Sequence, residues 1–157
     1  MNIIKTSIVN TENDVFWQDI SELTANMQPR PVLILVRRST VDTGMQLQKM
    51  LEACKLQPEQ YNIIYLNEGQ QTGWHQLNGR LDPFVVFLIG LLPAQLGVSA
   101  LFRLNLPNRF QDTIWLPSLP LEELDQRPEV KKELWSQGMK PVFVDQKFGP
   151  LVCVSKL

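Results

Sequence analysis

The strongest pattern in the chain is an uninterrupted apolar run from Val32 to Val36. Because apolar and polar side chains do not alternate in it, the run is typical of a strand buried on both faces, as in the middle of a parallel sheet. An amphipathic stretch at residues 47–54 carries apolar side chains at helical spacing and stops before Pro58. A second apolar run, at residues 63–66, completes a strand–helix–strand unit, whose two strands are expected to be parallel.

Further apolar runs extend this sheet. Residues 84–89 and 113–116 are predicted to be a third and a fourth buried strand, and residues 101–106 another strand or an extended segment. Short helices are predicted at residues 120–124 and from Pro128. Proline suits the first position of a helix, because a backbone N–H there would have no partner within the helix. The pattern therefore predicts an α/β protein with three layers, α/β/α, around a central, mostly parallel sheet of about four strands.

Three segments lie outside this regular pattern. Residues 1–9 favour either a short edge strand or a loose tail, and residues 13–27 carry apolar side chains at the spacing of an amphipathic helix. Residues 67–82 are polar and contain Gly69, Gly73 and Gly79. This composition indicates a long loop with at most one helical turn around Trp74.

The C-terminal residues are predicted to form a β-hairpin. Two apolar segments, at residues 141–145 and 151–154, flank a sequence rich in turn-forming residues. With 157 residues, the chain is expected to form one domain over residues 1–157, with its core at 29–139 and the hairpin at 140–157.

Composition narrows the classes of function. Hydrophobic residues make up 44% of the chain and charged residues 20%, as in ordinary soluble proteins, and the net charge of −1 disfavours a general nucleic-acid binder. No apolar run has the length of a membrane helix and the N-terminus lacks the pattern of a signal peptide, so we expect a cytoplasmic protein without membrane contact. Cys54 and Cys153 lack neighbouring cysteine or histidine residues, so we expect no metal and no cofactor.

In an open α/β sheet, ligands bind beyond the carboxyl ends of the strands. This rule predicts that residues 37–43, 90–99 and 116–119 converge at one edge. Ser118 lies in the last of these segments, but no neighbouring base that could activate it as a nucleophile is visible in the sequence.

A nucleic-acid or phosphate site is one hypothesis for this edge. Arg37, Arg38, Ser39 and Thr40 precede the N-terminus of a predicted helix, which is a favourable place for an anion, and Ser118 is expected nearby. The alternative is that the two arginines belong to a solvated turn.

Three stretches resemble the uracil-DNA glycosylase-like superfamily. They are PVLILVRRSTVDTGMQLQKMLEACKLQPEQYNIIYLN at residues 31–67, FVVFLIGLLPAQL at 84–96, and WLPSLPLEELDQRPEVKKELW at 115–135. Together they cover most of the chain between residues 31 and 138. The resemblance implies the α/β fold of that superfamily.

The same alignment shows departures from the active members. Their loop after the first strand holds a polar or acidic group that positions water, and here that place reads RRST at 37–40. Leu116 stands where the motif has a histidine, and leucine can neither donate a hydrogen bond nor carry a proton to the leaving base. The iron–sulfur ligands of some branches have no counterpart. His75, the single histidine, is interpreted as a solvated loop residue and Asp42 as a helix cap, so the chain is expected to be non-catalytic.

The third stretch also resembles the psi-subunit family of bacterial DNA polymerase III, in which the histidine before the proline is likewise missing. The resemblance implies an interaction subunit of the replication machinery, with clamp-loader subunits as partners and at most a weak single-stranded DNA contact. The alternatives are a nucleic-acid or nucleotide-binding protein of the same fold and a divergent active DNA glycosylase.

Exposed aromatic side chains are the candidate anchors for a protein partner, because such residues supply much of the binding energy at interfaces. For each candidate taken singly we favour the alternative that the ring lies in the core, and Trp135 is assigned to the core outright. The candidates are Trp17, Trp74, Phe102, Trp115 and Phe148.

Overall fold

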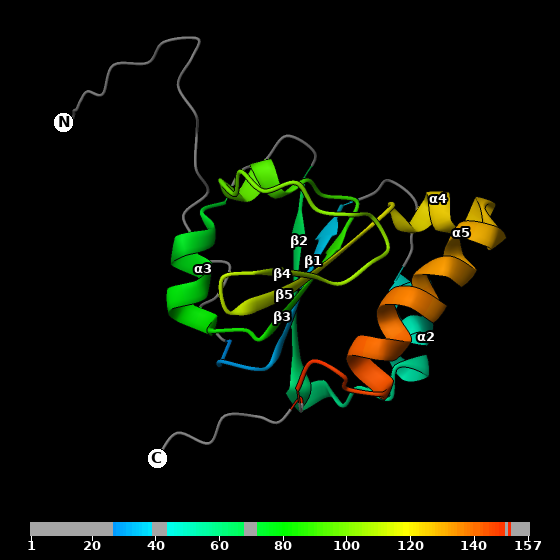
Figure 1. Ribbon diagram of the computed structural model, residues 1–157, viewed down its shortest axis with the longest axis horizontal. Helices are drawn as coiled ribbons and strands as arrows, with labels where there is room; N and C mark the ends of the chain where they lie inside the picture. Colours follow the sequence, from blue (N-terminus) through cyan, green and yellow to red (C-terminus); the bar gives the residue numbers. More distant parts are fainter. Residues whose placement is uncertain (1–26, 39–43, 68–71, 150, 152–157) are drawn as a thin grey trace, which may run out of the picture.

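A computed structural model describes residues 27–38, 44–67, 72–149 and 151. Within these ranges the chain forms a five-stranded sheet with the order β2-β1-β3-β5-β4 (Figure 1). The four strands predicted from the apolar runs are mutually parallel, and β4 pairs antiparallel with β5 at one edge. The strands are β1 (Val32–Arg37), β2 (Tyr61–Leu66), β3 (Val85–Ile89), β4 (Asn108–Phe110) and β5 (Thr113–Ser118).

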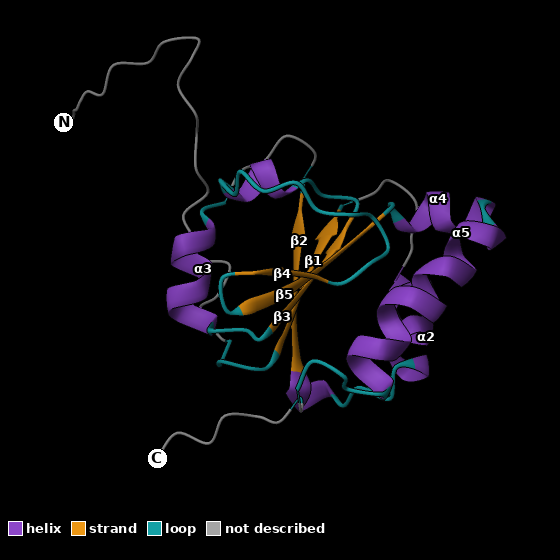
Figure 2. Ribbon diagram, in the orientation of Figure 1, coloured by secondary structure: helices purple, strands orange, loops and turns teal. Residues whose placement is uncertain are grey.

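Helices lie on both faces of the sheet (Figure 2). One face carries α3 (Trp74–Leu81), and the other carries α2 (Gly44–Ala53) and the C-terminal helices. Those are α4 (Leu121–Gln126), α5 (Pro128–Glu133) and η3 (Leu134–Val144), a π-helical segment that continues α5. The predicted α/β class and mostly parallel sheet are confirmed, and the arrangement is compatible with three layers.

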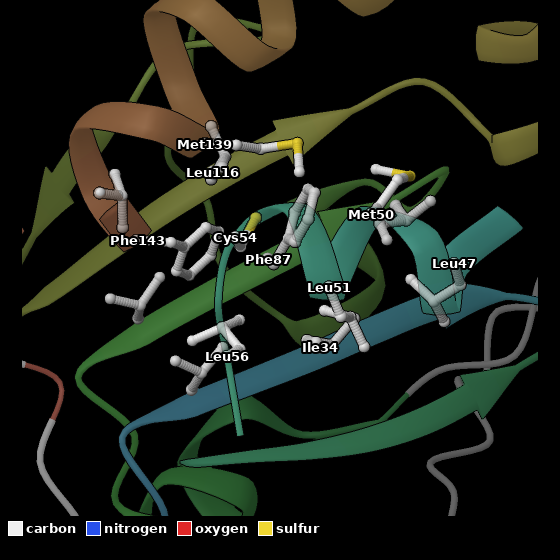
Figure 3. Close-up of a cluster of buried hydrophobic side chains, with 14 of the residues drawn as sticks. Ile34, Leu47, Met50, Leu51, Cys54, Leu56, Phe87, Leu116, Met139 and Phe143 are labelled. Atoms are coloured by element: carbon white, nitrogen blue, oxygen red, sulfur yellow. The ribbon is translucent and has the colours of Figure 1, made fainter. Parts of the chain in front are cut away.

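The side chains of α2 build the core on one face of the sheet. Leu47, Met50 and Leu51 are buried at helical spacing, as predicted, and Cys54 follows them (Figure 3). They pack with alternate side chains of the strands and with the C-terminal helix. The ring of Phe143 lies 5.8 Å from that of Phe87, a β3 residue, so η3 closes this core over the middle of the sheet.

Four aromatic rings build the core on the α3 face. Trp115 stacks on Phe102 at 5.3 Å between ring centroids and meets the edge of Trp74 at 4.6 Å, while Phe110 contacts both Phe102 and Trp115. Trp115 has no exposed surface and Trp74 is 8% exposed. The hypothesis that these two tryptophans are exposed anchors for a partner is therefore wrong, because they fill the space between α3 and the sheet.

Two predicted connections differ from the structure. Residues 74–81, expected to lie in a loop, form α3, because Trp74, Leu77 and Leu81 share one face and bury it against the sheet. Residues 101–106 form no strand, and the strand that pairs with β5 is β4, at residues 108–110. Backbone pairing with Thr113–Trp115, rather than local hydrophobicity, places this three-residue strand.

The predicted C-terminal hairpin is not formed as expected. Residues 141–144 belong to η3, so the first arm is helical, and most of the second arm lies outside the described residues. The reason is that Leu134, Gly138, Met139, Val142 and Phe143 continue one buried stripe at helical spacing. The predicted N-terminal helix, the edge strand at 1–9 and Trp17 also lie outside the described residues.

Across the ranges that the structure describes, no helix combines the length and the apolar character that crossing a membrane requires.

Cys54 is expected to be an unreactive thiol. It is 1% exposed, and burial raises its pKa from 9.0 to about 12. In a Cys153→Ser variant, alkylation of the native protein at pH 8 should therefore be slow until denaturant is added, because the thiolate is the nucleophile. Between pH 9 and 12 the unfolded chain loses this proton and the folded chain keeps it, so stability falls by roughly 1.4 kcal/mol per pH unit as pH rises. Subtracting the pH profile of the free energy of unfolding of a Cys54→Ala variant isolates the contribution of the Cys54 thiol. Identical profiles for the two proteins would contradict the prediction.

Candidate functional site

The carboxyl ends of three parallel strands meet at a pocket of about 360 Å³. Its walls come from the end of β1, the turn after β3 and the segment that joins β5 to α4, so the predicted convergence of these segments is confirmed for the described residues. The chain turns to α2 on one face after β1 and reaches β3 from α3 on the other, which makes this the switch point of the sheet. The lining residues are Arg37, Gly90, Leu91, Leu92, Pro93, Gln95, Phe102, Leu104, Pro117, Ser118, Leu119, Pro120 and Glu123.

Gly90 allows these strand ends to approach one another. It has a φ of +77°, and a β-carbon there would lie 3.1 Å from the Cα of Pro120 and 3.2 Å from the Cβ of Arg37. Its N–H donates a hydrogen bond of 3.0 Å to the carbonyl oxygen of Ser118. A residue with a side chain would be strained in this left-handed conformation and would press against Pro120 and Arg37. Glycine is therefore required at this position of the pocket lining.

The charge of Arg37 is compensated within the chain. Its Nη2 lies 2.9 Å from Oε2 of Glu122, and both side chains are partly exposed, at 24% and 29%. Glu122 stands in the first turn of α4, and the neighbouring Glu123 lines the pocket. Because the guanidinium is paired with Glu122 and the lining carries the further carboxylate of Glu123, this part of the edge is a poor site for a phosphate.

Of the other predicted phosphate-binding residues, Ser118 lines the pocket with Arg37, whereas Arg38 lies elsewhere. Arg38 is exposed and lies over the ring of Tyr65, with its guanidinium carbon 5.9 Å from the ring centroid. It is absent from the pocket lining. Ser39 and Thr40 lie outside the described residues. The hypothesis of a nucleic-acid or phosphate site stays a prediction.

The hydroxyl of Ser118 is hydrogen-bonded to the backbone and has a structural role. Its side chain is 4% exposed, and its Oγ lies 3.2 Å from the carbonyl oxygen of Leu88 and 3.1 Å from that of Leu119, to which its hydroxyl donates. Among the residues that the structure describes, no base makes a hydrogen bond to it, so they provide no activated nucleophile there. Among the residues that the structure describes, no cluster of three histidine, cysteine or acidic side chains could hold a metal ion.

One part of the pocket rim is apolar. Leu92 is 67% exposed and Leu104 46% exposed, and both line the pocket together with half-buried Phe102. Leu101 precedes Phe102 in the chain and is fully exposed, although it does not line the pocket. Sequence reasoning singled out Phe102 but missed the leucines, because it assigned apolar residues of this region to the core or to strands. The signal that could have found Leu92 is its position between Leu91 and Pro93, where a strand or helix cannot continue.

Phe148 and His75 lie away from this pocket. Phe148 is half-buried and packs against the core under the C-terminal helix, which leaves it only a partial surface for a partner. His75 is exposed in the first turn of α3, where it lines a separate cavity with Trp74 and Phe110.

Comparison with known families and proteins adds no further constraint on the site. No protein-family model matches the chain, and a search of curated proteins finds no similar sequence.

Proposed function

We propose that this protein is a non-catalytic interaction subunit of the DNA replication or repair machinery, built on a uracil-DNA glycosylase-like scaffold and related to the psi-subunit family of DNA polymerase III. The observation that carries the proposal is the apolar rim of the carboxyl-edge pocket, formed by Leu92, Phe102 and Leu104. An enzyme of this architecture would hold polar catalytic groups at the same edge.

The positions that would carry catalysis support a non-catalytic role. Leu116, aligned with the missing histidine, has no exposed surface and packs in the core under the C-terminal helix. Arg37 occupies the place of the water-positioning group and pairs with Glu122. Neither position can protonate a leaving base or activate water, so the electrostatic stabilisation that base excision needs has no source among them.

The apolar rim has the physical character of a protein-binding surface. Exposed leucines grouped around a pocket leave apolar surface in water, which a partner side chain can cover. Full burial of one leucine contributes about 1.5–3 kcal/mol, so two or three of them suffice to dominate an interface of modest affinity.

The test is purification of the tagged full chain with clamp-loader subunits. We expect these subunits to co-purify, and a Leu92→Asp/Leu104→Asp variant to lose at least ten-fold in affinity, because a carboxylate would have to be desolvated in the contact. Circular dichroism should show an unchanged melting temperature, since both side chains are exposed.

Tyr65→Asp serves as the matched control, since Tyr65 is 38% exposed on the edge strand β2, outside the pocket lining. Unchanged affinity of the double variant would place the interface elsewhere. Release of uracil from uracil-containing DNA by the purified chain would contradict the non-catalytic assignment.

A further inference from the structure

A second cavity, of about 510 Å³, lies between α2 and the C-terminal helix. We propose that this groove, hereafter the methionine groove, binds an acidic amphipathic helix of a partner protein. The two cavities have no described lining residue in common, so the inference does not depend on the function proposed for the carboxyl-edge pocket. The lining residues are Met45, Gln46, Lys49, Met50, Ala53, Asp125, Lys131, Leu134, Trp135 and Met139.

The floor of the groove is apolar and adaptable. Met50 extends from α2 and Met139 from η3, and the two lie on facing sides of the core (Figure 3). Met45 is 74% exposed at the mouth, and Trp135 is only partly buried. Unbranched thioether side chains reshape easily around an inserted side chain, and a partly exposed tryptophan is a common anchor at interfaces.

A lysine side chain lies on each wall of the groove. Lys49 is exposed on α2 and Lys131 lies on α5 across the groove. Neither joins an ion pair with another described residue; the described pairs are Arg37–Glu122 and Lys140–Asp145. Among the described residues of the lining, Asp125, at the α4 end, is the one acidic side chain.

This combination specifies the chemistry of the occupant. A helix that places leucine-type side chains at positions i, i+3, i+4 and i+7 would fill the apolar floor, and glutamates flanking that stripe would meet Lys49 and Lys131. A small molecule fits less well, because the lining offers few free polar groups to orient it. The amide of Gln46, for example, donates to the carbonyl oxygen of Leu121 at 3.0 Å.

The probe for the test is a fluorescein-labelled synthetic helix with leucines at those positions and glutamates on both flanks, titrated with the full chain and followed by anisotropy. A matched peptide carries lysine for every glutamate. We expect the acidic peptide to bind at least ten-fold more tightly than the basic one, and to lose affinity as ionic strength rises.

Charge variants sharpen the test. Lys49→Glu and Lys131→Glu should each weaken the acidic peptide several-fold, and Asp125→Asn should tighten its binding. Lys132→Glu makes the same charge change in the next residue of α5, outside the groove lining, and should have a much smaller effect than Lys131→Glu.

Methyl NMR of methionine locates the bound peptide. The resonances of Met45, Met50 and Met139 should shift on binding, while that of Met27, which packs against the core on the α3 face, should not. Equal binding of the two peptides, absence of binding, or shifts confined to Met27 would overturn the proposal. Binding abolished by Leu92→Asp/Leu104→Asp would do so as well, because it would place the peptide at the carboxyl edge.

Discussion

Replacing Trp115 with alanine should lower the free energy of unfolding by about 3–5 kcal/mol, the cost typical of removing a large buried aromatic side chain. Trp115 has no exposed surface and contacts Trp74, Phe102 and Phe110, which come from three different segments of the chain. Its loss would leave a cavity between α3 and the sheet that these rings cannot fill without moving.

The measurement is thermal or urea unfolding of the purified variant. For a chain of this size, the expected loss corresponds to a fall of roughly 6–20 °C in Tm. Trp115→Phe is the informative second variant. The buried indole Nε1 has no hydrogen-bond partner among the described residues, so phenylalanine removes an unsatisfied donor while keeping much of the ring volume. It should cost less than half as much as alanine, and equal losses would show that the indole N–H is satisfied after all.

Substitution of alanine at two helical glycines should have opposite effects on stability. At Gly138, in η3, a β-carbon would lie 2.7 Å from Cδ1 of Leu116 and 2.8 Å from the carbonyl oxygen of Asn105. The backbone oxygen cannot move aside as a flexible side chain can, so Gly138→Ala should destabilise the protein by about 1–3 kcal/mol. The gain of alanine over glycine in helix propensity, about 0.5–1 kcal/mol, only partly offsets this clash.

Gly79 supplies the matched control. It lies in α3, and a β-carbon there meets no neighbouring atom within 4 Å. Gly79→Ala should therefore raise stability by about 0.5–1 kcal/mol, since the unfolded chain loses conformational freedom and nothing clashes. Changes of the same sign in the two variants would show that η3 does not pack against Leu116 and Asn105 as described.

Comparison of Trp115→Ala with the Leu92→Asp/Leu104→Asp variant separates an effect on folding from an effect on partner binding. Trp115 was a candidate anchor for a partner on its aromatic character alone, yet its side chain is wholly enclosed. Lost partner binding in Trp115→Ala would thus follow from unfolding of the α3 face. Leu92→Asp/Leu104→Asp acts on exposed side chains, so its effect on binding reports on the surface itself.

The position of the candidate site in the fold was predictable from the sequence, but the contacts and the exposure of its residues were predictable only in part. The rule that ligands bind at the carboxyl ends of parallel strands indicated which three segments meet, because it depends on strand direction alone. The partner of Arg37 was not predictable, since Glu122 lies 85 residues away in the chain and reaches it only through the packing of α4. Exposure of Leu92 and Leu104 was missed for the same reason, because burial depends on what covers a side chain.

By itself, the sequence determined the elements whose patterns are strong and local. Residues 32–36 and 85–89 are apolar without interruption, which requires strands covered on both faces, and Pro128 marks a helix start because of its own backbone chemistry. Only the tertiary structure decided the elements whose patterns are weak or ambiguous. Residues 141–144 satisfied a strand pattern and a helical stripe equally well, and their burial as the end of η3 selected the helix. β4 is too short to carry a pattern, and the hydrogen bonds that define it exist only once Thr113–Trp115 lies beside it.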